Sequence, residues 1–543
     1  MKNWWQIGVV YQIYPRSFQD SNGDGIGDLQ GIKQRLPYLK WLGVHSIWIS
    51  PIYPSPMADF GYDVSDYLEI HPMFGTLKDM DALISDVHDH DLKIILDFVP
   101  NHTSDQHEWF LESRSSKNNA KRDWYIWRDS AADGGPPNNW LSRFDGKSAW
   151  EWDEATGQFY LHSFLKEQPD LNWRNPEVKT AMLDVLRFWF NRGVDGFRVD
   201  VSYRVMKDTQ FRDNPPNPNW QPGMDPSKQV IELHTKNIPD IHLFNRWLRE
   251  VADEFEDKVL IGEINLPFPQ LVKHYGDIEN GRSEFHLPFN FRLIFADWNP
   301  TTVRALVEEY ERVLPVGAWP NWVLGNHDQH RVASRVGTAQ ARLAMMMMLT
   351  LRGTPTVYYG DETGMMDGII PPDRVQDPWE IFVPGIGLGR DPERTPMQWD
   401  GSENAGFCEP DVMPWLPVGE NRTAVNTTTQ QSDPTSILTM TRKLLKLRQD
   451  NPALHSGAYQ SIDSPDDLFT YMRTDGKQQF LIALNFSNQP QSWELPVDVD
   501  RLLLSTVGDK PEPVREGVLH LRPNEGLLFD LYVIGKKFLE YSE

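Results

Sequence analysis

Short apolar runs alternate with longer amphipathic stretches through most of the chain, and each run leads into a polar or charged residue. The apolar runs have the length of buried strands, whereas the stretches between them have the spacing of helices. Alternation of this kind predicts βα units arranged around a parallel sheet. The expected strands are Val9–Ile13, Ser46–Ile49, Lys93–Phe98, Gly196–Val199, Val259–Ile261, Trp322–Leu324 and Thr356–Tyr359.

One helix is well marked at both ends. Asn175 suits the N-cap, Pro176 suits the first turn, and Gly193 stops the pattern. The pattern predicts a helix over Pro176–Asn191. Its apolar residues at helical spacing are Val178, Met182, Val185, Leu186 and Trp189.

The expected strands lead into His, Asp, Glu and Arg. Catalytic groups gather at the C-terminal ends of the strands in a barrel of alternating strands and helices. Irregular sequence follows His102, and loops of that length are usually functional. We therefore expect an α/β fold: a (β/α)8 TIM barrel with an inserted loop-rich domain after its third strand and a C-terminal antiparallel β-domain.

The end of the chain has a different pattern. A long irregular loop, 361–434, precedes a last helix that Asp433-Pro434 is expected to cap. Two later apolar runs, Leu468–Met472 and Phe480–Asn485, flank Asp475-Gly476, which indicates a hairpin. The expected units are 1–102 and 173–455 for the barrel, 103–172 for the inserted subdomain B, and 456–543 for the β-domain.

Charge and composition narrow the class of partner. The 543 residues carry a net charge of −24, which disfavours nucleic acid and anionic membranes, so a small-molecule partner is expected. No apolar run is long enough to span a membrane. Cys408 is the only cysteine, and Met1–Trp5 leads directly into a strand-like run without a signal-peptide pattern, so we expect a cytoplasmic protein.

Three carboxylates carry the candidate chemistry. Asp200, Glu263 and Asp328 each follow a different expected strand, so a barrel would bring them to one rim. Arg198 lies two residues before Asp200, on the same face of its strand. A pair of carboxyl groups about 5–5.5 Å apart serves a retaining glycosidase, in which one attacks the anomeric carbon and the other protonates the leaving oxygen.

Four ordered segments resemble the signature regions of the α-amylase family, glycoside hydrolase family thirteen: Asp97–His102, Gly196–Asp200, Gly262-Glu263 and Asn326–Asp328. The resemblance runs from about Val10 into the final β-domain. It implies that Asp200 is the nucleophile, Glu263 the general acid/base and Asp328 the transition-state stabiliser. It also implies that His102, Arg198 and His327 contact the sugar in the first subsite.

A further segment, Gln168–Asn172, resembles that of oligo-1,6-glucosidases and related α-glucosidases rather than endo-acting amylases. In such enzymes Asp59 would hold the 4-hydroxyl of a terminal glucose, Tyr62 would stack on its face, and Arg394 would be the partner of Asp59. Phe164 and Gln168 complete the expected substrate contacts. The chain departs from the family pattern at His45, Phe60 and Gly325, and none of these departures removes a catalytic group.

The segment Asp20–Asp28 supplies oxygen atoms at alternating positions, as a calcium loop does. It is not an EF-hand, because Gly31 occupies the position of the final glutamate. It resembles the divalent-ion loop of the oligo-1,6-glucosidase branch. A structural Ca²⁺ or Mg²⁺ is therefore expected, as an alternative to a turn without metal. The expected ligands are Asp20, Asn22, Asp24, the Ile26 carbonyl and Asp28.

The leading interpretation is an exo-acting retaining α-glucosidase that releases glucose from short α-glucosides of the maltose, isomaltose or sucrose type. A glucosyltransferase or a sucrose or trehalose isomerase would use the same site with another acceptor. A catalytically silent, transporter-associated subunit is disfavoured, because all three acids are present and no span is encoded. In the enzymes that the chain resembles, Val after the nucleophile favours α-1,6 bonds and Ala or Thr favours α-1,4 bonds, so Val201 hints at α-1,6 linkage. Other α-glucosidases with Val there act on α-1,4 bonds, so both linkages stay open, and the sequence does not give the oligomeric state.

Overall fold

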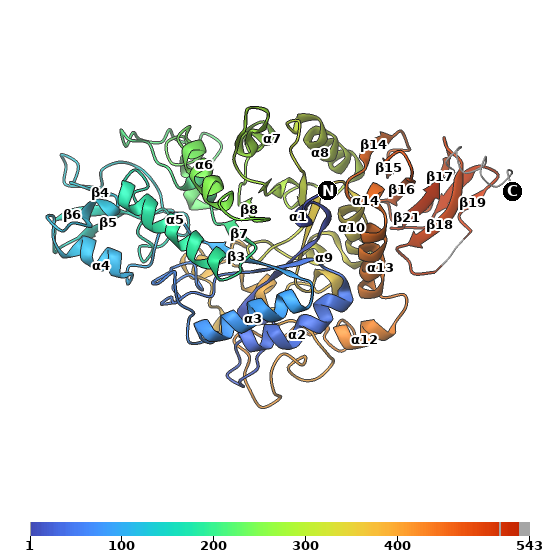
Figure 1. Ribbon diagram of the computed structural model, residues 1–543, viewed down its shortest axis with the longest axis horizontal. Coiled ribbons are helices and arrows are strands. Elements are labelled where there is room, and N and C mark those ends of the chain that lie inside the picture. The colour runs from blue at the N-terminus through green and yellow to red at the C-terminus, as the bar shows by residue number, and fades with distance from the viewer. Residues whose placement is uncertain (1, 510–511, 532–543) are drawn as a thin grey trace.

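The computed structural model describes residues 2–509 and 512–531, and its centre is a barrel of eight parallel strands (Figure 1). The strand order is β11-β8-β7-β3-β2-β1-β13-β12, in which β13 pairs with β1. This arrangement confirms the predicted (β/α)8 fold. The strands are β1 (Val10–Ile13), β2 (Ser46–Ile49), β3 (Lys93–Phe98), β7 (Gly196–Val199), β8 (Val259–Gly262), β11 (Leu287–Pro288), β12 (Asn321–Val323) and β13 (Thr354–Tyr358).

The barrel closes through a side chain between β11 and β12. Asn321 donates from Nδ2 to the carbonyl of Pro288, and its Oδ1 accepts the N–H of Asn290 at 2.9 Å. Strand β11 has only two residues, one of them proline, so it left no apolar run in the sequence to predict it. The Asn321 amide thus takes the place of backbone pairing at this joint.

Helices form the outer layer of the barrel. The predicted helix over Pro176–Asn191 is α5, and its N-cap Asn175 accepts the N–H of Glu177 at 2.8 Å. The other main helices are α2 (Leu29–Leu42), α3 (Leu77–Asp89), α6 (Ile241–Ala252), α8 (Pro300–Val313), α10 (Thr338–Thr350) and α13 (Ile437–Asp450).

The helix that precedes the C-terminal domain starts later than expected. Ser436, not Asp433, caps α13, and its hydroxyl accepts the N–H of Thr439 at 3.0 Å. Asp433 instead accepts the N–H of Thr435 at 2.8 Å. Asp433-Pro434 therefore forms the turn between α12 (Thr427–Ser432) and α13. The prediction that this dipeptide caps the helix was wrong.

The inserted segment 103–172 lies at one end of the molecule and the C-terminal domain at the other (Figure 1). The insert holds α4 (Glu108–Ser115) and a small antiparallel sheet in the order β4-β6-β5. Its strands are β4 (Trp127–Arg128), β5 (Trp150–Asp153) and β6 (Gln158–Leu161). It has an apolar cluster of its own, formed by Trp140, Ala149, Trp150, Phe159 and Leu161.

The C-terminal domain is antiparallel, as predicted. Its five-stranded sheet has the order β14-β15-β16-β21-β18, and a second sheet has the order β17-β20-β19. The expected hairpin at Asp475-Gly476 joins β15 to β16. The strands are β14 (Ala458–Ile462), β15 (Leu468–Thr474), β16 (Gln479–Asn485), β17 (Gln491–Glu494), β18 (Val499–Ser505), β19 (Val514–Arg515), β20 (Val518–Leu521) and β21 (Gly526–Leu531).

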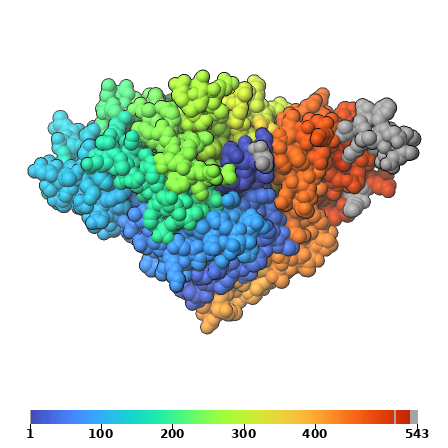
Figure 2. Space-filling view, in the orientation of Figure 1, coloured from blue at the N-terminus to red at the C-terminus, as the bar shows by residue number. Residues whose placement is uncertain are grey.

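The barrel, the insert and the C-terminal domain form one continuous wedge-shaped surface (Figure 2). Across 2–509 and 512–531, no helix has both the length and the apolar character needed to cross a bilayer.

Candidate active site

The C-terminal ends of the barrel strands surround a cavity of about 360 Å³. A cavity of this volume is in the range of small-ligand sites. Seven of the predicted site residues line it: Asp59, Tyr62, His102, Phe164, Asp200, Glu263 and Asp328. The other predicted site residues, Gln168, Arg198, His327 and Arg394, are buried behind this wall and bind the lining side chains.

Arg198 joins the catalytic carboxylates. It lies on β7 and is 1% exposed. Its Nη1 lies 2.7 Å from Asp200 and its Nη2 lies 2.7 Å from Glu263. The same Nη1 lies 2.9 Å from Asp97, on β3. One guanidinium therefore fixes two carboxylates from neighbouring strand ends in front of the cavity and holds a third beneath them.

The charge balance around Arg198 depends on burial. Burial raises the pKa of Asp200 well above its ordinary value, and the Glu263 and Asp97 carboxylates raise it further, while Arg198 opposes both effects. Burial also raises the pKa of Asp97, to about 6, against the influence of Arg198. Ionised Asp200 thus depends on the positive charge of Arg198, because the dry, acidic surroundings favour the neutral acid.

Asp328 has the opposite environment. Arg394 contacts its carboxylate at 2.8 Å and Arg390 at 3.3 Å, and His327 Nε2 lies 3.3 Å from its other oxygen. Burial opposes ionisation, but His327 and the two guanidinium groups outweigh it and hold the pKa of Asp328 below its usual range. Asp328 is therefore a fixed negative charge at the cavity wall.

The partner of Asp59 is Arg390, which corrects the expectation that it is Arg394. Arg390 Nη2 donates to Asp59 Oδ1 at 2.7 Å, and Asp377 holds the same guanidinium at 2.7 Å. Arg394 instead donates to the His327 carbonyl at 2.7 Å and to Asp328. Two arginines four positions apart thus serve different carboxylates, because buried Asp377 turns Arg390 toward Asp59.

The predicted sugar-binding residues form a connected network. The Tyr62 hydroxyl lies 2.7 Å from His327 Nε2, and their rings are stacked. His102 Nε2 lies 3.1 Å from Gln168 Nε2, which also donates to Asp59 at 3.2 Å. Burial lowers the pKa of His102 to about 4, so its ring is neutral at neutral pH. Gln168 therefore positions Asp59 and His102 from behind the wall.

Sequence reasoning missed several residues of the site, and three of them contact residues that were predicted. Asp97 is the first residue of the signature segment Asp97–His102, yet only the fold shows it beside Arg198. Arg390 lies in the long loop 361–434, four positions before Arg394. Phe144 lines the cavity between Phe164 and Trp379, and no motif marked it.

The proposed ion loop, Asp20–Asp28, has the expected oxygen donors, but its carboxylates do not all lie close to one another. Asp20 Oδ1 accepts the N–H of Asn22 at 2.9 Å, Asn22 Oδ1 that of Asp24 at 3.0 Å, and Asp24 Oδ1 that of Ile26 at 2.9 Å. These serial turns hold the oxygen-bearing side chains in one tight loop. In the part of the chain that the structure describes, the carboxylates of residues 20, 24 and 28 do not converge within 4.8 Å.

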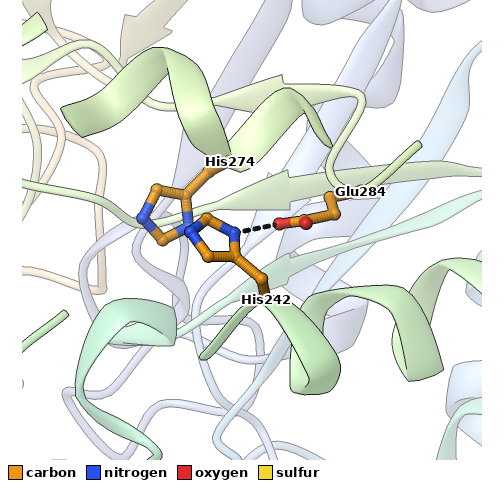
Figure 3. Close-up of side chains that lie close together, drawn as sticks. All are labelled: His242, His274 and Glu284. Atoms are coloured by element: carbon orange, nitrogen blue, oxygen red, sulfur yellow. Dashed lines mark hydrogen bonds and ion pairs between the residues drawn. The ribbon is translucent and has the colours of Figure 1, made fainter. Parts of the chain in front are cut away.

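Among the described residues, two other groups of side chains that could ligate a metal do lie close together. His242 Nδ1 lies 2.8 Å from Glu284, with His274 beside them (Figure 3). Asn245 Nδ2 donates both to Glu284 at 2.7 Å and to His274 Nδ1 at 2.9 Å. The side-chain amide of Asn245 therefore already binds two of the atoms that would have to bind a metal. We regard this group as a buried hydrogen-bonded cluster. The second group is His330, Asp367 and Glu393, next to the active-site cavity.

Comparisons with known proteins agree with this geometry. The family model of the alpha amylase catalytic domain matches residues 12–457. The chain is 42% identical to a probable alpha-glucosidase of Rhizobium meliloti (strain 1021), over 91% of this chain and 92% of that protein. It is 38% identical to an oligo-1,6-glucosidase of Parageobacillus thermoglucosidasius, over 97% and 99% of the two chains.

Solved structures show the same similarity. The alpha-glucosyl transfer enzyme XgtA superposes with a TM-score of 0.92 at 37% identity, over 98% of this chain and all of that chain. The trehalulose synthase MutB from Pseudomonas mesoacidophila MX-45 gives 0.89 at 34% identity, over 98% of this chain and 100% of that chain.

Together with these relatives, the (β/α)8 barrel and the three carboxylates around its cavity identify a glycoside hydrolase. The chain belongs to the alpha-amylase family. Within that family it falls in the α-glucosidase and oligo-1,6-glucosidase branch.

Proposed function

We propose that this chain is an exo-acting α-glucosidase that works with retention of configuration. The observation that supports it most is the shared binding of Asp200 and Glu263 by Arg198, at 2.7 Å each. A retaining enzyme needs its two carboxyl groups about 5–5.5 Å apart, and the position of one guanidinium between Asp200 and Glu263 is compatible with that spacing. An inverting enzyme separates them by about 6.5–9.5 Å to leave room for a water.

The mechanism assigns one role to each acid. Protonated Glu263 gives its proton to the glycosidic oxygen as the bond from C1 to that oxygen breaks, and ionised Asp200 attacks C1 to form a covalent glucosyl-enzyme. Glu263, now a carboxylate, then takes a proton from water, whose oxygen displaces Asp200. Asp328, a fixed negative charge, stabilises positive charge that develops on the sugar ring.

Exo-action follows from the closed end of the cavity. Asp59 and Arg390 are both buried and form a 2.7 Å ion pair there. Each group retains hydrogen-bonding capacity for the last hydroxyl groups of a terminal glucose, and the pair, with the Phe144 ring next to Arg390, would block a longer chain at this end. Glucose is therefore released one unit at a time.

Transfer to another sugar is the second candidate function. The glucosyl-enzyme reacts with whichever hydroxyl reaches C1, and the structural similarity to an alpha-glucosyl transfer enzyme and a trehalulose synthase favours such a side reaction. A silent binding subunit is disfavoured, because Asp200, Glu263 and Asp328 all line one cavity.

The loop Asp20–Asp28 is the proposed site of a structural Ca²⁺ or Mg²⁺. Its carboxylate, amide and carbonyl oxygens are the donors that these hard cations prefer. The ion would stabilise the loop after β1, and the chemistry of the acids does not depend on it.

A cytoplasmic location stays a prediction that cell fractionation would test.

The test is the product pattern from maltotetraose and isomaltotriose. Retention and exo-action predict that glucose appears first as its α-anomer by NMR, together with a chain shortened by one unit. First release of β-glucose would contradict retention, and release of maltose as the first product would contradict exo-action.

A further inference from the structure

The outer wall of the active-site cavity is rich in positive charge, although the chain as a whole carries −24. Four cationic side chains line it: Arg143, Arg204, Lys228 and Lys236. They come from the inserted subdomain B and from the long loop after β7. The same cavity is also lined by Asp59, Asp200, Glu263 and Asp328, with Arg390 beside Asp59 and Asp328. We call the part around these carboxylates the inner half of the cavity, and the part around the four cations, which also contains Glu232, its outer half.

Nearby carboxylates neutralise only part of this positive charge. Glu232 binds Arg204 with two hydrogen bonds of 2.6 and 2.8 Å. Asp225 binds Arg143 at 2.8 Å and lies 3.8 Å from Lys228. These two carboxylates serve three cations and leave an excess of positive charge.

Lys236 has no such partner. Among the described residues, its ammonium group makes no ion pair within 4.0 Å of a carboxylate. It lies 5.3 Å from the centre of the Tyr203 ring, three residues beyond Asp200. Burial and the charges of Arg204, Arg143 and Lys228 lower the pKa of Lys236 to about 8, although Glu232 opposes this. A half-buried cation among other cations is stabilised by an anion that enters the cavity.

The inner half is lined by four carboxylates and is the place of the glucose that is cleaved, so an anionic group of the substrate is expected outside it. It must therefore belong to the part of the substrate on the leaving side of the scissile bond. We infer that the outer half of the cavity, with Lys236 at its centre, binds a phosphate or carboxylate carried by the aglycone of the α-glucoside. This inference rests on the proposed glucosidase function and names a substrate class for it.

The chemistry of the reaction is unchanged. The bond from C1 to the glycosidic oxygen breaks, Glu263 supplies the proton to that oxygen, and the aglycone leaves with its anionic group intact. Lys236 acts by positioning the anion, so its contribution is expected mainly in KM.

The experiment compares matched pairs of substrates. One pair is 4-carboxyphenyl and 4-carbamoylphenyl α-glucoside, and the other is trehalose 6-phosphate and trehalose. The ratio of kcat/KM for the anionic over the neutral member is measured in the wild type, Lys236→Met, Lys236→Arg and the control Lys446→Met, a lysine on α13 that is 69% exposed. Comparing the same ratio between enzymes cancels the difference in leaving-group acidity within a pair.

At least one pair should show a ratio that falls by about tenfold in Lys236→Met, the scale of one charge-assisted hydrogen bond. Lys236→Arg should keep most of the preference, and Lys446→Met all of it. In the wild type the ratio should fall with added salt and above about pH 8, where Lys236 loses its charge. The pair that responds distinguishes carboxylate from phosphate.

The neutral substrate 4-nitrophenyl α-glucoside shows whether the enzyme is a glucosidase at all. If it is cleaved, but both pairs give the same ratio in the wild type and Lys236→Met with no salt dependence, the inference is overturned. Failure to cleave that neutral substrate would instead count against the proposed glucosidase function. If Lys236→Met does not fold, the salt and pH dependence of the wild-type ratio decides the question alone.

Discussion

The backbone N–H of Val201 donates a 2.8 Å hydrogen bond to the carboxylate of Glu263. Val201 follows the nucleophile directly, and its backbone has φ of 34° and ψ of 39°, a left-handed conformation that strains a β-branched residue. Strain of this kind persists where the surrounding structure imposes it, often at functional sites. Here it couples the loop of the nucleophile to the position of the acid/base.

Val201→Thr should shift the linkage preference toward α-1,4 bonds. Threonine keeps the branched shape and the backbone N–H, so the only change at the cavity wall is one methyl group replaced by a hydroxyl. We expect the ratio of kcat/KM for maltose over isomaltose to rise by roughly tenfold, the scale of one changed contact in a substrate pocket. Val316→Thr, at a residue that is 75% exposed, is the control. An unchanged ratio would place linkage preference elsewhere.

Arg390→Met should damage both activity and stability. Asp59 and Asp377 are buried, and the loss of Arg390 would leave both without their main counter-ion. Breaking a buried pair in this way costs about 3–5 kcal/mol. We expect the midpoint of urea unfolding to fall and kcat/KM for maltose to drop at least about a hundredfold, because Asp59 no longer holds the terminal glucose.

Arg282→Met is the matched control, since that arginine is 67% exposed in its pair with Asp277. An exposed pair contributes about 0–1 kcal/mol, so little change is expected there. Equal effects of the two substitutions would contradict the role given to Arg390.

The stability of the protein should depend on pH through Asp97. Burial raises its pKa from 3.8 in the unfolded chain to about 6 in the fold. The folded state therefore favours the protonated acid: its contribution to stability is fully present below pH 3.8 and is lost as the pH rises through 6.

Asp97→Asn cannot lose a proton, so its free energy of unfolding relative to wild type should increase between about pH 4 and pH 7. The full change is on the order of 1–3 kcal/mol, at about 1.36 kcal/mol per pKa unit. Urea unfolding across this pH range measures it, with exposed Asp373→Asn as control. A difference that is constant, or that decreases with pH, would refute the assignment.

Removal of the proposed ion should lower the melting temperature. An ion that binds only the folded state stabilises it in proportion to the logarithm of its concentration above Kd. Calcium or magnesium added to chelator-treated protein should therefore raise Tm, and Asp24→Ala should abolish that response. Asp373→Ala should retain it. A Tm that ignores chelator and ions, with no ion found by elemental analysis, would rule out the site.

The fold was predictable where the pattern is local. The apolar spacing of α5 is complete within sixteen consecutive residues and its N-cap directly precedes them, so the observed bounds agree with the prediction. Strand β11 was missed because its two residues are too few to show a periodic pattern. The Asn321 amide, which closes the barrel beside this strand, acts across the fold. The barrel thus follows from repeated local signals, while its last joint depends on a contact across the fold.

The site divides in the same way. Asp200, Glu263 and Asp328 follow strands, so their convergence could be predicted. The choice between Arg390 and Arg394 as partner of Asp59 could not, because it depends on buried Asp377 in a loop without regular pattern. Spacing along the chain does not say which of two nearby guanidinium groups faces a given carboxylate.

The most direct test of the central assignment uses Glu263→Gln with α-glucosyl fluoride. Fluoride leaves without a proton, so Asp200 should still form the glucosyl-enzyme, but the missing base slows its hydrolysis and the adduct should accumulate. Peptide mapping by mass spectrometry should place the glucosyl group on Asp200, and azide should restore turnover with an α-linked product. An adduct on another residue, or no adduct together with a β-linked azide product, would contradict the assignment of Asp200 and the retaining mechanism.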